Sequence, residues 1–331
     1  MNTVIIAEAG VNHNGNMELA KRLIVEAYNA GADFVKFQTA VDCTSKYAPK
    51  AEYQKKTTGA NESQLEMAKK LRLTLEQHYE LYEYCNKVGI SYLSTAFDIE
   101  SVKFLDELDL PFWKIPSGEI TNLPYLIEIG KTKKPVVMST GMSELYEISD
   151  AIKVLKENGT GDITLLQCHT DYPTKMENVN LNAMLTLKRN FQTKVGLSDH
   201  SIGIEVPIAA VALGAKVIEK HFTIDRNMTG PDHLASIEPA ELSRMVKSIR
   251  NIEKAMGDGE KTCSSVEKAN IIVARKSIVA KRDIQKGELL TEKNITTKRP
   301  GNGISAMKWF DVLGTKAVKD FKEDELICTE L

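Results

Sequence analysis

Two histidines in this sequence are placed where they could bind a metal ion. His221 ends the apolar run VIEKH, and His200 ends GLSDH twenty-one residues earlier. Neutral imidazole suits divalent ions of the first transition row, and two protein ligands leave positions open for water and substrate oxygens. The pair predicts a Lewis-acid metal site, with a hydrogen-bonded structural role for each ring as the alternative. A second alternative makes His233, in GPDHLAS, one of the ligands.

Two lysines lie inside apolar runs, Lys36 in FVKFQ and Lys114 in FWKIPS. A buried charge costs free energy unless it meets an anion. Three interpretations remain open: pairing with a carboxylate of the protein, binding of a substrate phosphate or carboxylate, and a Schiff base with a carbonyl substrate. Hydroxyls near the ends of other apolar runs favour the second, because hydroxyls and backbone N–H groups donate to phosphate oxygens. These hydroxyls belong to Thr95, Ser117, Ser139 and Ser198.

Four carboxylates lie near the same positions. Asp199 and Glu219 are neighbours of the histidines in sequence, but side chains alternate along a strand, so they need not point the same way. Glu8 and Glu119 follow other apolar runs. Each is either the structural partner of a lysine or a general acid or base that acts on a metal-bound water or a substrate hydroxyl.

The elements that must position these side chains are eight short apolar runs, each ending in polar residues: 4–9, 34–37, 91–93, 112–115, 136–138, 163–166, 195–197 and 217–218. Amphipathic helical patterns separate most of them, and such alternation predicts a parallel sheet covered on both faces. Eight units favour a (β/α)8 TIM barrel over an open doubly wound sheet, with the chemistry at the carboxyl ends of the strands. The long gap from 39 to about 63 predicts an active-site loop or a partly disordered segment.

The chain of 331 residues is long enough for a barrel of about 250 residues and a small module. We expect the barrel over 1–260, a linker over 261–274 and a turn-rich second domain over 275–331. That last segment has 12 Lys/Arg and 9 Asp/Glu, a net charge of +3, which leaves −5 for the rest of the formal −2. We therefore expect the module to dock on an acidic barrel of the same or a neighbouring subunit.

Composition excludes several classes of protein. The net charge of −2 gives no reason to expect binding to nucleic acid or to a membrane. Five scattered cysteines without a CxxC motif indicate a reducing compartment and no zinc ribbon. The first apolar run is too short for a signal peptide, and no run of about 18 apolar residues is present. We expect a cytoplasmic protein.

The motifs together resemble those of the sialic acid synthases, the N-acetylneuraminate synthase group with its legionaminate and pseudaminate relatives. In chain order they are IIAEAGVNHNG, FVKFQT, WKIPSGE, STGM, GLSDH, EKHFT, GPDH and KRPGNGIS. Any one motif is modest, but eight in order are highly specific. The resemblance covers essentially the whole chain, and it includes a C-terminal module similar to an antifreeze-protein-like (SAF) domain.

The resemblance implies a metal-dependent condensation of phosphoenolpyruvate with the open-chain aldehyde of an N-acylated hexosamine. Carbon 3 of phosphoenolpyruvate attacks the aldehyde carbon, water adds at carbon 2, and phosphate leaves with cleavage of its C–O bond. The implied metal is Mn2+, with Mg2+ or Co2+ possible, on His200 and His221. Glu8 matches a carboxylate beside the metal and its water. The implied phosphoenolpyruvate contacts are Lys36, Thr95, Lys114, Ser117, Ser139 and Ser198.

The implied sugar contacts are Gln38, Asn61, Glu119, Tyr172 and Asp232. Arg299, in KRPGNG, matches an arginine that reaches from the SAF domain of one subunit into the barrel of the other, which implies a domain-swapped homodimer. The family commonly has CTNxYP or CNTEYP where this sequence has CHTDYPT. Thr170 or Asp171 therefore stands where a polar sugar contact is usual.

The prediction is an N-acetylneuraminate synthase that uses phosphoenolpyruvate and N-acetylmannosamine. The alternative within the family is a legionaminate synthase that uses a 2,4-diacetamido-trideoxyhexose. Two alternatives come from other classes: a non-catalytic carbohydrate- or ice-binding protein, suggested by the SAF-like module, and an aldolase that forms a Schiff base at Lys114. The first fits poorly with a charge-dense module and with so many polar strand ends.

Overall fold

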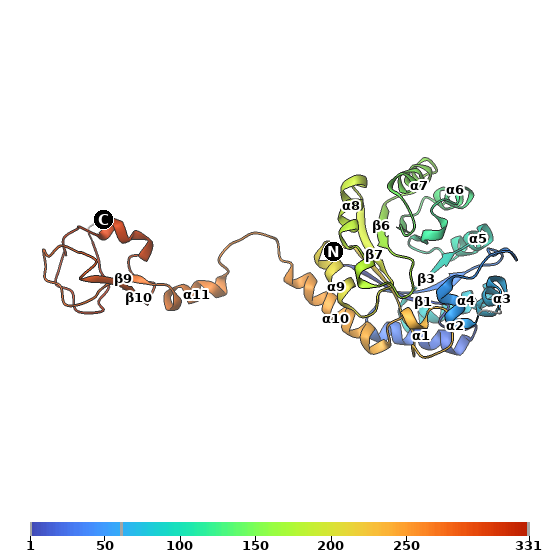
Figure 1. Cartoon of the computed structure of the whole chain (residues 1–331), viewed down its shortest axis with the longest axis horizontal. Helices are drawn as coiled ribbons and strands as arrows, with labels where there is room; N and C mark the ends of the chain where they lie inside the picture. The colour runs from blue at the N-terminus through green and yellow to red at the C-terminus, as the bar shows by residue number, and fades with distance from the viewer. Residues whose placement is uncertain (1, 60–61, 330–331) are drawn as a thin grey trace. The chain divides into compact units, whose positions relative to one another are not determined.

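The computed structural model describes residues 2–59 and 62–329. The chain forms two compact units, Met1–Gly257 and Asp258–Leu331 (Figure 1). The segment predicted as a linker, 261–274, contains the helix α11 (Ser265–Ala274). This helix begins with a capping box, in which Ser264 accepts from the Glu267 N–H and the Glu267 carboxylate accepts from the Ser264 N–H. Local capping therefore gives structure to a stretch whose composition alone predicted a connection.

The first unit is built on one sheet of eight strands, and every hydrogen-bonded pair in it is parallel. The strands are β1 (Val4–Gly10), β2 (Phe34–Thr39), β3 (Ser91–Ala96), β4 (Trp113–Ile115), β5 (Val136–Ser139), β6 (Ile163–Cys168), β7 (Lys194–Asp199) and β8 (Val217–His221). Their order is β3-β2-β1-β8-β7-β6-β5-β4, and β3 and β4 lie against each other. The sheet is thus a closed ring, and the predicted TIM barrel is confirmed.

Helices surround this ring (Figure 1). They are α1 (Met17–Ala30), α4 (Leu75–Val88), α5 (Ile99–Glu107), α6 (Leu123–Lys131), α7 (Leu145–Glu157), α8 (Asn182–Phe191), α9 (Glu205–Ala212) and α10 (Pro239–Ala255). The helix α1 shows how the sequence sets their ends: the Asn16 side chain accepts from the Leu19 N–H, and Gly31 ends the helix with a φ of 81°. The long gap after β2 holds two further helices, α2 (Glu52–Thr58) and α3 (Gln64–Leu71).

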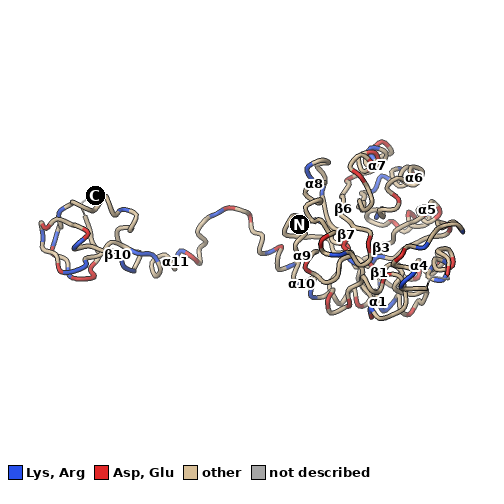
Figure 2. Tube along the Cα trace, in the orientation of Figure 1, with Lys and Arg blue, Asp and Glu red and all other residues tan. Residues whose placement is uncertain are grey.

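The second unit has a small core of its own. Strands β9 (Ser277–Ala280) and β10 (Ile295–Lys298) pair antiparallel. The short helix α12 (Trp309–Val312) follows them in the chain and contributes Val312 to the core. The largest buried side chains of this core include Ile278, Leu290 and Phe321. Lys and Arg are interspersed with Asp and Glu along the trace of this unit (Figure 2). Within the described residues of both units, no helix is long and apolar enough to cross a membrane.

Strand register brings the polar strand ends to two neighbouring levels of the barrel. Glu8 of β1 is the partner of Lys36 on one side and of His221 on the other, and Ser198 of β7 is the partner of Glu219 of β8. Because the side chains of a strand alternate between its faces, Glu219 and His221 share the inner face. The polar cluster is therefore built from side chains of several strands, which the register of the sheet holds together.

The outer face of β7 and β8 carries a different pair. Asp199 and Lys220 are partners in register, and both are buried. The Lys220 ammonium donates to the Asp199 carboxylate and, at 2.7 Å, to the carbonyl of Ser201. Alternation therefore separates the polar residues of EKH into an outer structural ion pair and two inner groups that face the barrel interior.

The helix α4 carries a histidine that is fully buried against β3. The Nδ1 atom of His78 lies 2.9 Å from the Tyr92 hydroxyl. Burial, and to a smaller extent the nearby His13, lowers the pKa of His78 to about 3. The folded barrel thus keeps this imidazole neutral at pH values where the unfolded chain protonates it.

We predict that His78 makes the barrel sensitive to acid. The unfolded chain binds a proton at His78 below pH 6.5, whereas the folded barrel binds it only near pH 3, so stability is complete above pH 6.5 and is lost as pH falls from 6.5 towards 3. At pH 5 the loss is about 2 kcal/mol for this one group. Urea unfolding at pH 8 and pH 5 should show a smaller loss for His78→Gln than for the wild type. Equal losses would contradict this origin.

Candidate active site

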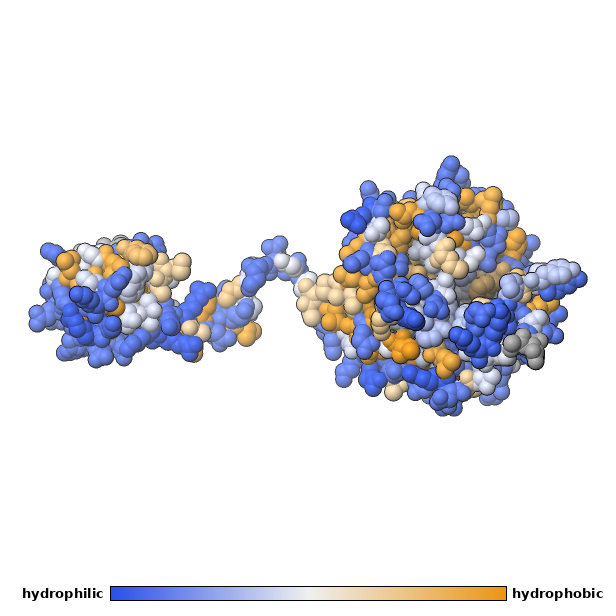
Figure 3. All heavy atoms as spheres, viewed as in Figure 1, coloured by the Kyte–Doolittle hydropathy of each residue, from blue (hydrophilic) through white to orange (hydrophobic). Residues whose placement is uncertain are grey.

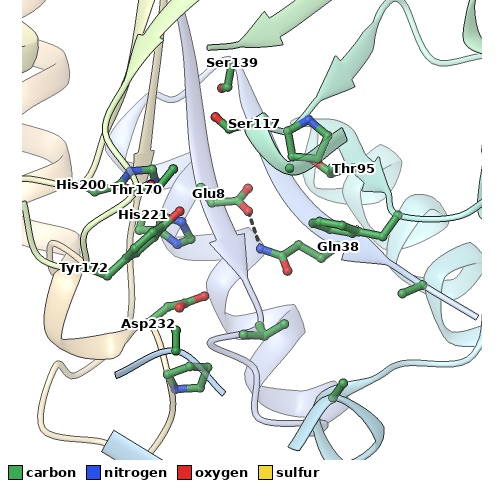
Figure 4. A pocket seen from close by; sticks show the side chains of 18 of the residues that line it. Glu8, Gln38, Thr95, Ser117, Ser139, Thr170, Tyr172, His200, His221 and Asp232 are labelled. Carbon is green, nitrogen blue, oxygen red and sulfur yellow. Dashed lines mark hydrogen bonds between the residues drawn. The ribbon is translucent and has the colours of Figure 1, made fainter. Parts of the chain in front are cut away.

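A cavity of about 560 Å³ lies at the carboxyl ends of the barrel strands. On this unit hydrophobic and hydrophilic side chains are both exposed (Figure 3), but the cavity collects mainly polar ones (Figure 4). Thirteen of the fifteen site residues predicted from the sequence line it: Glu8, Lys36, Gln38, Thr95, Lys114, Ser117, Glu119, Ser139, Tyr172, Ser198, His200, His221 and Asp232. One cavity thus gathers side chains from all eight strand ends.

The other two predicted residues are placed differently. Asn61 lies outside the described residues. Arg299 belongs to the second unit, where it is exposed and its Nε donates to the Ala274 carbonyl at 3.2 Å. Its predicted reach into the barrel of a neighbouring subunit remains a prediction.

The two candidate metal ligands are neighbours in this cavity. The ring centroids of His200 and His221 are 5.3 Å apart. The Nδ1 atom of His200 lies 2.6 Å from the carbonyl of His169. A carbonyl only accepts, so Nδ1 carries the proton and Nε2 of His200 has a free lone pair, as metal-binding histidines require. In His221 the Nδ1 atom is buried and has no hydrogen-bond partner among the described residues.

The surroundings shift the pKa values of the two rings in opposite directions. Burial, then the nearby His200 and Lys36, lowers the pKa of His221 well below its ordinary value, which keeps this ring neutral. Burial opposes a charge on His200 as well, but the Cys168 sulfur, 3.9 Å from its Nδ1, raises the pKa of His200. Within residues 2–59 and 62–329, no three His, Cys, Asp or Glu side chains converge on one metal position. An ion here would therefore use two imidazoles and complete its shell with solvent or substrate.

The alternative ligand His233 is occupied elsewhere. Its Nδ1 atom lies 2.7 Å from the Thr223 hydroxyl, and its Nε2 atom lies 3.3 Å from the side-chain oxygen of Asn14. It does not line the cavity. The geometry gives this ring a structural place and leaves the pair His200 and His221 as the candidate ligands.

Below the histidines lies a network of buried charges. The ammonium of Lys36 is 2.7 Å from Glu8, 2.7 Å from the Thr95 hydroxyl and 3.6 Å from Glu219. The ammonium of Lys114 is 3.3 Å from the other oxygen of Glu219. Both lysines thus pair with protein carboxylates, as one interpretation of the sequence predicted, and both also line the cavity.

The network fixes which groups keep their charge. Burial opposes ionisation of Glu219, but Lys114 and Lys36 outweigh it and lower its pKa to about 2. Burial raises the pKa of Glu8, although Lys36 acts in the opposite direction. Burial lowers the pKa of Lys114, although the charge of Glu219 acts to raise it. Glu219 is therefore the fixed anion, while Glu8 and Lys114 exchange protons more readily.

Spare donors identify where an anion could bind. An ammonium has three N–H donors, and Lys36 has three acceptors within 3.6 Å. Lys114 has only Glu219 and, at 3.4 Å, the carbonyl of Ile115, so one donor remains for a ligand. The buried Ser139 hydroxyl has no partner among the described residues. Lys114 and Ser139 are thus the free donors of the floor, which suits a phosphate or carboxylate.

The remaining predicted contacts surround this floor. The Ser117 hydroxyl accepts from the Gly141 N–H at 2.9 Å, and the Ser198 hydroxyl donates to Glu219 at 2.8 Å. The Gln38 amide donates to Glu8 at 3.1 Å (Figure 4). Glu119 pairs with neither lysine; it accepts from the Asn122 amide, and burial raises its pKa. A partly buried acid without a cation beside it is a candidate proton donor.

Two more side chains close the cavity beside the histidines. Burial, then the charge of Glu8, raises the pKa of Asp232 to about 7. The ring centroid of Tyr172 lies 4.0 Å from the ring centroid of His200. In the segment CHTDYPT, Thr170 lines the cavity, whereas Asp171 is exposed and does not line it.

Two of the lining residues that sequence reasoning did not assign to the site matter for its geometry. Glu219 was left undecided, although it stands two residues before His221 in one strand, and that spacing places both side chains on one face. Tyr53 also lines the cavity, from α2 in the long connection after β2. No local pattern signals Tyr53, because its contacts are made with residues distant in the sequence.

Two family models match the chain. The model of the NeuB family matches residues 23–261, and that of the SAF domain matches residues 275–330. The chain belongs to the NeuB family. The family prediction made from the sequence is confirmed, and with it the prediction of a nonulosonic acid synthase.

Individual relatives of this NeuB-family chain cover nearly its full length. It is 57% identical to the N,N'-diacetyllegionaminic acid synthase of Campylobacter jejuni, over 98% of each chain. It is 46% identical to the enzyme of the same name from Legionella pneumophila, over 96% of this chain and 90% of that one. A crystal structure of N-acetylneuraminic acid synthetase from Leptospira borgpetersenii, in complex with citrate, matches with a TM-score of 0.72 and 34% identity, over 82% of this chain and 90% of that one.

We predict that Glu219→Gln destabilises the barrel strongly. Removal of the shared anion leaves Lys36 and Lys114 with one carboxylate between them, and breaking a buried ion pair typically costs about 3–5 kcal/mol. Urea unfolding at pH 7 measures the change in the free energy of unfolding.

The matched control is Asp162→Asn, which removes an exposed partner 2.9 Å from Lys194. Solvent screens a surface pair and leaves it little effect on stability, so this variant should unfold almost as the wild type does. A Glu219→Gln loss no larger than that of the control would show that the buried network does not depend on Glu219.

Proposed function

We propose that this NeuB-family chain condenses phosphoenolpyruvate with a 2,4-diacetamido-2,4,6-trideoxyhexose to form N,N'-diacetyllegionaminic acid. The observation that carries the proposal is the 57% identity to a synthase of that name over 98% of both chains. The N-acetylneuraminate reading, favoured from the sequence, has support from the family and from a relative at 34% identity. It is therefore the second candidate, with N-acetylmannosamine as substrate.

In this proposal the floor of the cavity binds phosphoenolpyruvate. The spare donor of Lys114 and the hydroxyl of Ser139 offer hydrogen bonds to its anionic oxygens, and these charge-assisted bonds are strong because both groups are buried. Lys36 keeps Glu8 oriented beside them. Phosphate and carboxylate would occupy a site whose donors are already in place before the ligand arrives.

The reaction then needs three proton transfers. Carbon 3 of phosphoenolpyruvate forms a bond to the aldehyde carbon, and the aldehyde oxygen takes a proton, for which Glu119 is the proposed donor because burial raises its pKa. A water molecule adds at carbon 2 and gives a proton to Glu8, which burial makes more ready to accept one by raising its pKa. The bond between carbon 2 and the phosphate oxygen breaks, the new hydroxyl on carbon 2 passes its proton to the leaving phosphate, and carbon 2 becomes the ketone of the product.

The two imidazoles fit a divalent ion, with Mn2+ proposed first and Mg2+ or Co2+ as alternatives. The fit rests on the free lone pair of His200 and on the unpartnered buried nitrogen of His221. A bound ion would polarise the aldehyde carbonyl. The cavity wall of Tyr172, Asp232 and Gln38 would orient the sugar beside it.

We also propose that the active unit is a homodimer in which Arg299 of each second unit completes the barrel site of the other subunit. The exposed position of Arg299 and the net charge of +3 on 275–331 support this arrangement. The proposed setting of the reaction is the cytoplasm.

A substrate panel tests the proposal. With phosphoenolpyruvate and Mn2+, we expect phosphate release and a product of the mass of N,N'-diacetyllegionaminic acid, with kcat/KM at least about tenfold above that for N-acetylmannosamine, since buried polar contacts discriminate by at least that factor. Preference for N-acetylmannosamine would instead establish the second candidate. Borohydride trapping with pyruvate and no need for metal would favour the aldolase, and absence of any turnover would favour a binding protein.

The histidine pair has its own test. His221→Ala should lower turnover by about 1,000-fold or more, because several kcal/mol of charge stabilisation depends on the ion. The far-UV circular dichroism should remain that of the wild type, and Mn2+ binding should be lost. His233→Gln is the matched control and should retain Mn2+ affinity. Full Mn2+-dependent turnover in His221→Ala would exclude the pair as the ligands.

A further inference from the structure

A chain of aromatic rings leads from the connection after β2 to the candidate metal ligands. The ring of Tyr53, in α2, stacks on the ring of Tyr172 with centroids 4.9 Å apart and planes 19° apart. Tyr172 in turn lies 4.0 Å from His200 and, edge to face, 5.8 Å from His221. Tyr172 therefore covers both imidazoles, and Tyr53 covers the ring of Tyr172.

Little else in α2 makes such a contact. This helix has no fully buried residue. The hydroxyls of Thr57 and Thr58 bond to carbonyls of their own helix, and Thr58 also lies 3.6 Å from the sulfur of Met67 in α3. Among the described residues, α2 contacts the imidazole side of the cavity through the stack of Tyr53 on Tyr172.

The orientation of His200 is set by contacts at one edge and on one face of its ring. At the edge, its Nδ1 atom lies 2.6 Å from the carbonyl of His169 and 3.9 Å from the Cys168 sulfur, and rotation of the ring breaks the first of these hydrogen bonds. The face of Tyr172 blocks that rotation from one side. Tyr172 can do so only while its own ring is held, and Tyr53 is the aromatic partner stacked on it.

We propose that Tyr53 is a positioning residue: by stacking on Tyr172 it keeps His200 turned towards the metal position. This inference rests on the metal site of the proposed function. It assigns to the connection after β2 a part in metal affinity, although no residue of that connection needs to touch the ion. Orienting groups beyond the ligands are known to change metal affinity severalfold or more.

A rival explanation is that Tyr53 contacts the sugar directly, since it lines the cavity. The two explanations differ in the absence of substrate. A positioning residue affects Mn2+ affinity of the free enzyme, whereas a sugar contact affects only the KM of the sugar. Mn2+ affinity measured without substrates, by the electron paramagnetic resonance signal of the free ion, therefore separates them.

The experiment compares Tyr53→Ala, Tyr53→Phe and Tyr47→Ala in the full-length protein. Tyr47 lies in the same connection but is 82% exposed and does not line the cavity, so it is the matched control. We expect Tyr53→Ala to weaken Mn2+ binding about fivefold, within the range that an aromatic pair supplies. Tyr53→Phe, which keeps the stack, and Tyr47→Ala should stay within about twofold of the wild type. Circular dichroism confirms that each variant is folded.

A double variant tests the route through Tyr172. If Tyr53 acts by holding Tyr172, the double variant Tyr53→Ala, Tyr172→Ala should bind Mn2+ no more weakly than Tyr172→Ala alone. Additive losses, or a Tyr53→Ala variant with wild-type Mn2+ affinity and a raised KM for the sugar alone, would overturn the inference. Absence of Mn2+ binding by the wild type would instead overturn the metal site of the proposed function, and this inference with it.

Discussion

The site depends on one carboxylate shared by two buried cations. Glu219 lies 3.3 Å from Lys114 and 3.6 Å from Lys36, and all three side chains are almost completely excluded from solvent. Three such charges are costly to bury separately, and each is tolerated because the others are within reach. The barrel supplies that proximity, because parallel strands in fixed register place Glu8 beside Lys36 and His221, and Ser198 beside Glu219 two residues earlier in β8. The same three charges therefore affect both the stability of the fold and the electrostatics of the cavity.

The network also gives lysines of the same chemistry different roles. Lys36 has two protein acceptors at 2.7 Å, Glu8 and Thr95, whereas Lys114 has only longer contacts, at 3.3 and 3.4 Å. The alternation of β8 makes a similar division: Lys220 faces outward into a structural pair with Asp199, while its two neighbours face the cavity. Residue type alone would not separate these lysines. The distances from each ammonium to its acceptors do, because the ammonium with the longer contacts is the more available to a ligand.

The cavity also has a part that does not depend on the sheet. Relatives named for different sugars match the chain over most of its length. Besides the charged side chains of the strands, Tyr53, Thr170, Tyr172 and Asp232 line the cavity, and they come from three different connections. These four side chains lie outside the strands, so their positions depend on the conformation of the connections and not on the register of the sheet.

The sequence by itself determined the architecture and most of the site. Eight apolar runs with polar ends predict a barrel because continuous apolar strands separated by amphipathic helices have few other ways to bury their surface. Strand ends in a barrel converge, so Lys36, Lys114, His200 and His221 could be assigned to one cavity without coordinates. Only the tertiary structure decided that Glu219 is the shared anion, that His233 is bonded to Thr223 and Asn14, and that Tyr53 stacks on Tyr172. These outcomes depend on which way a side chain turns and on contacts between segments distant in the chain, and neither is encoded in local spacing.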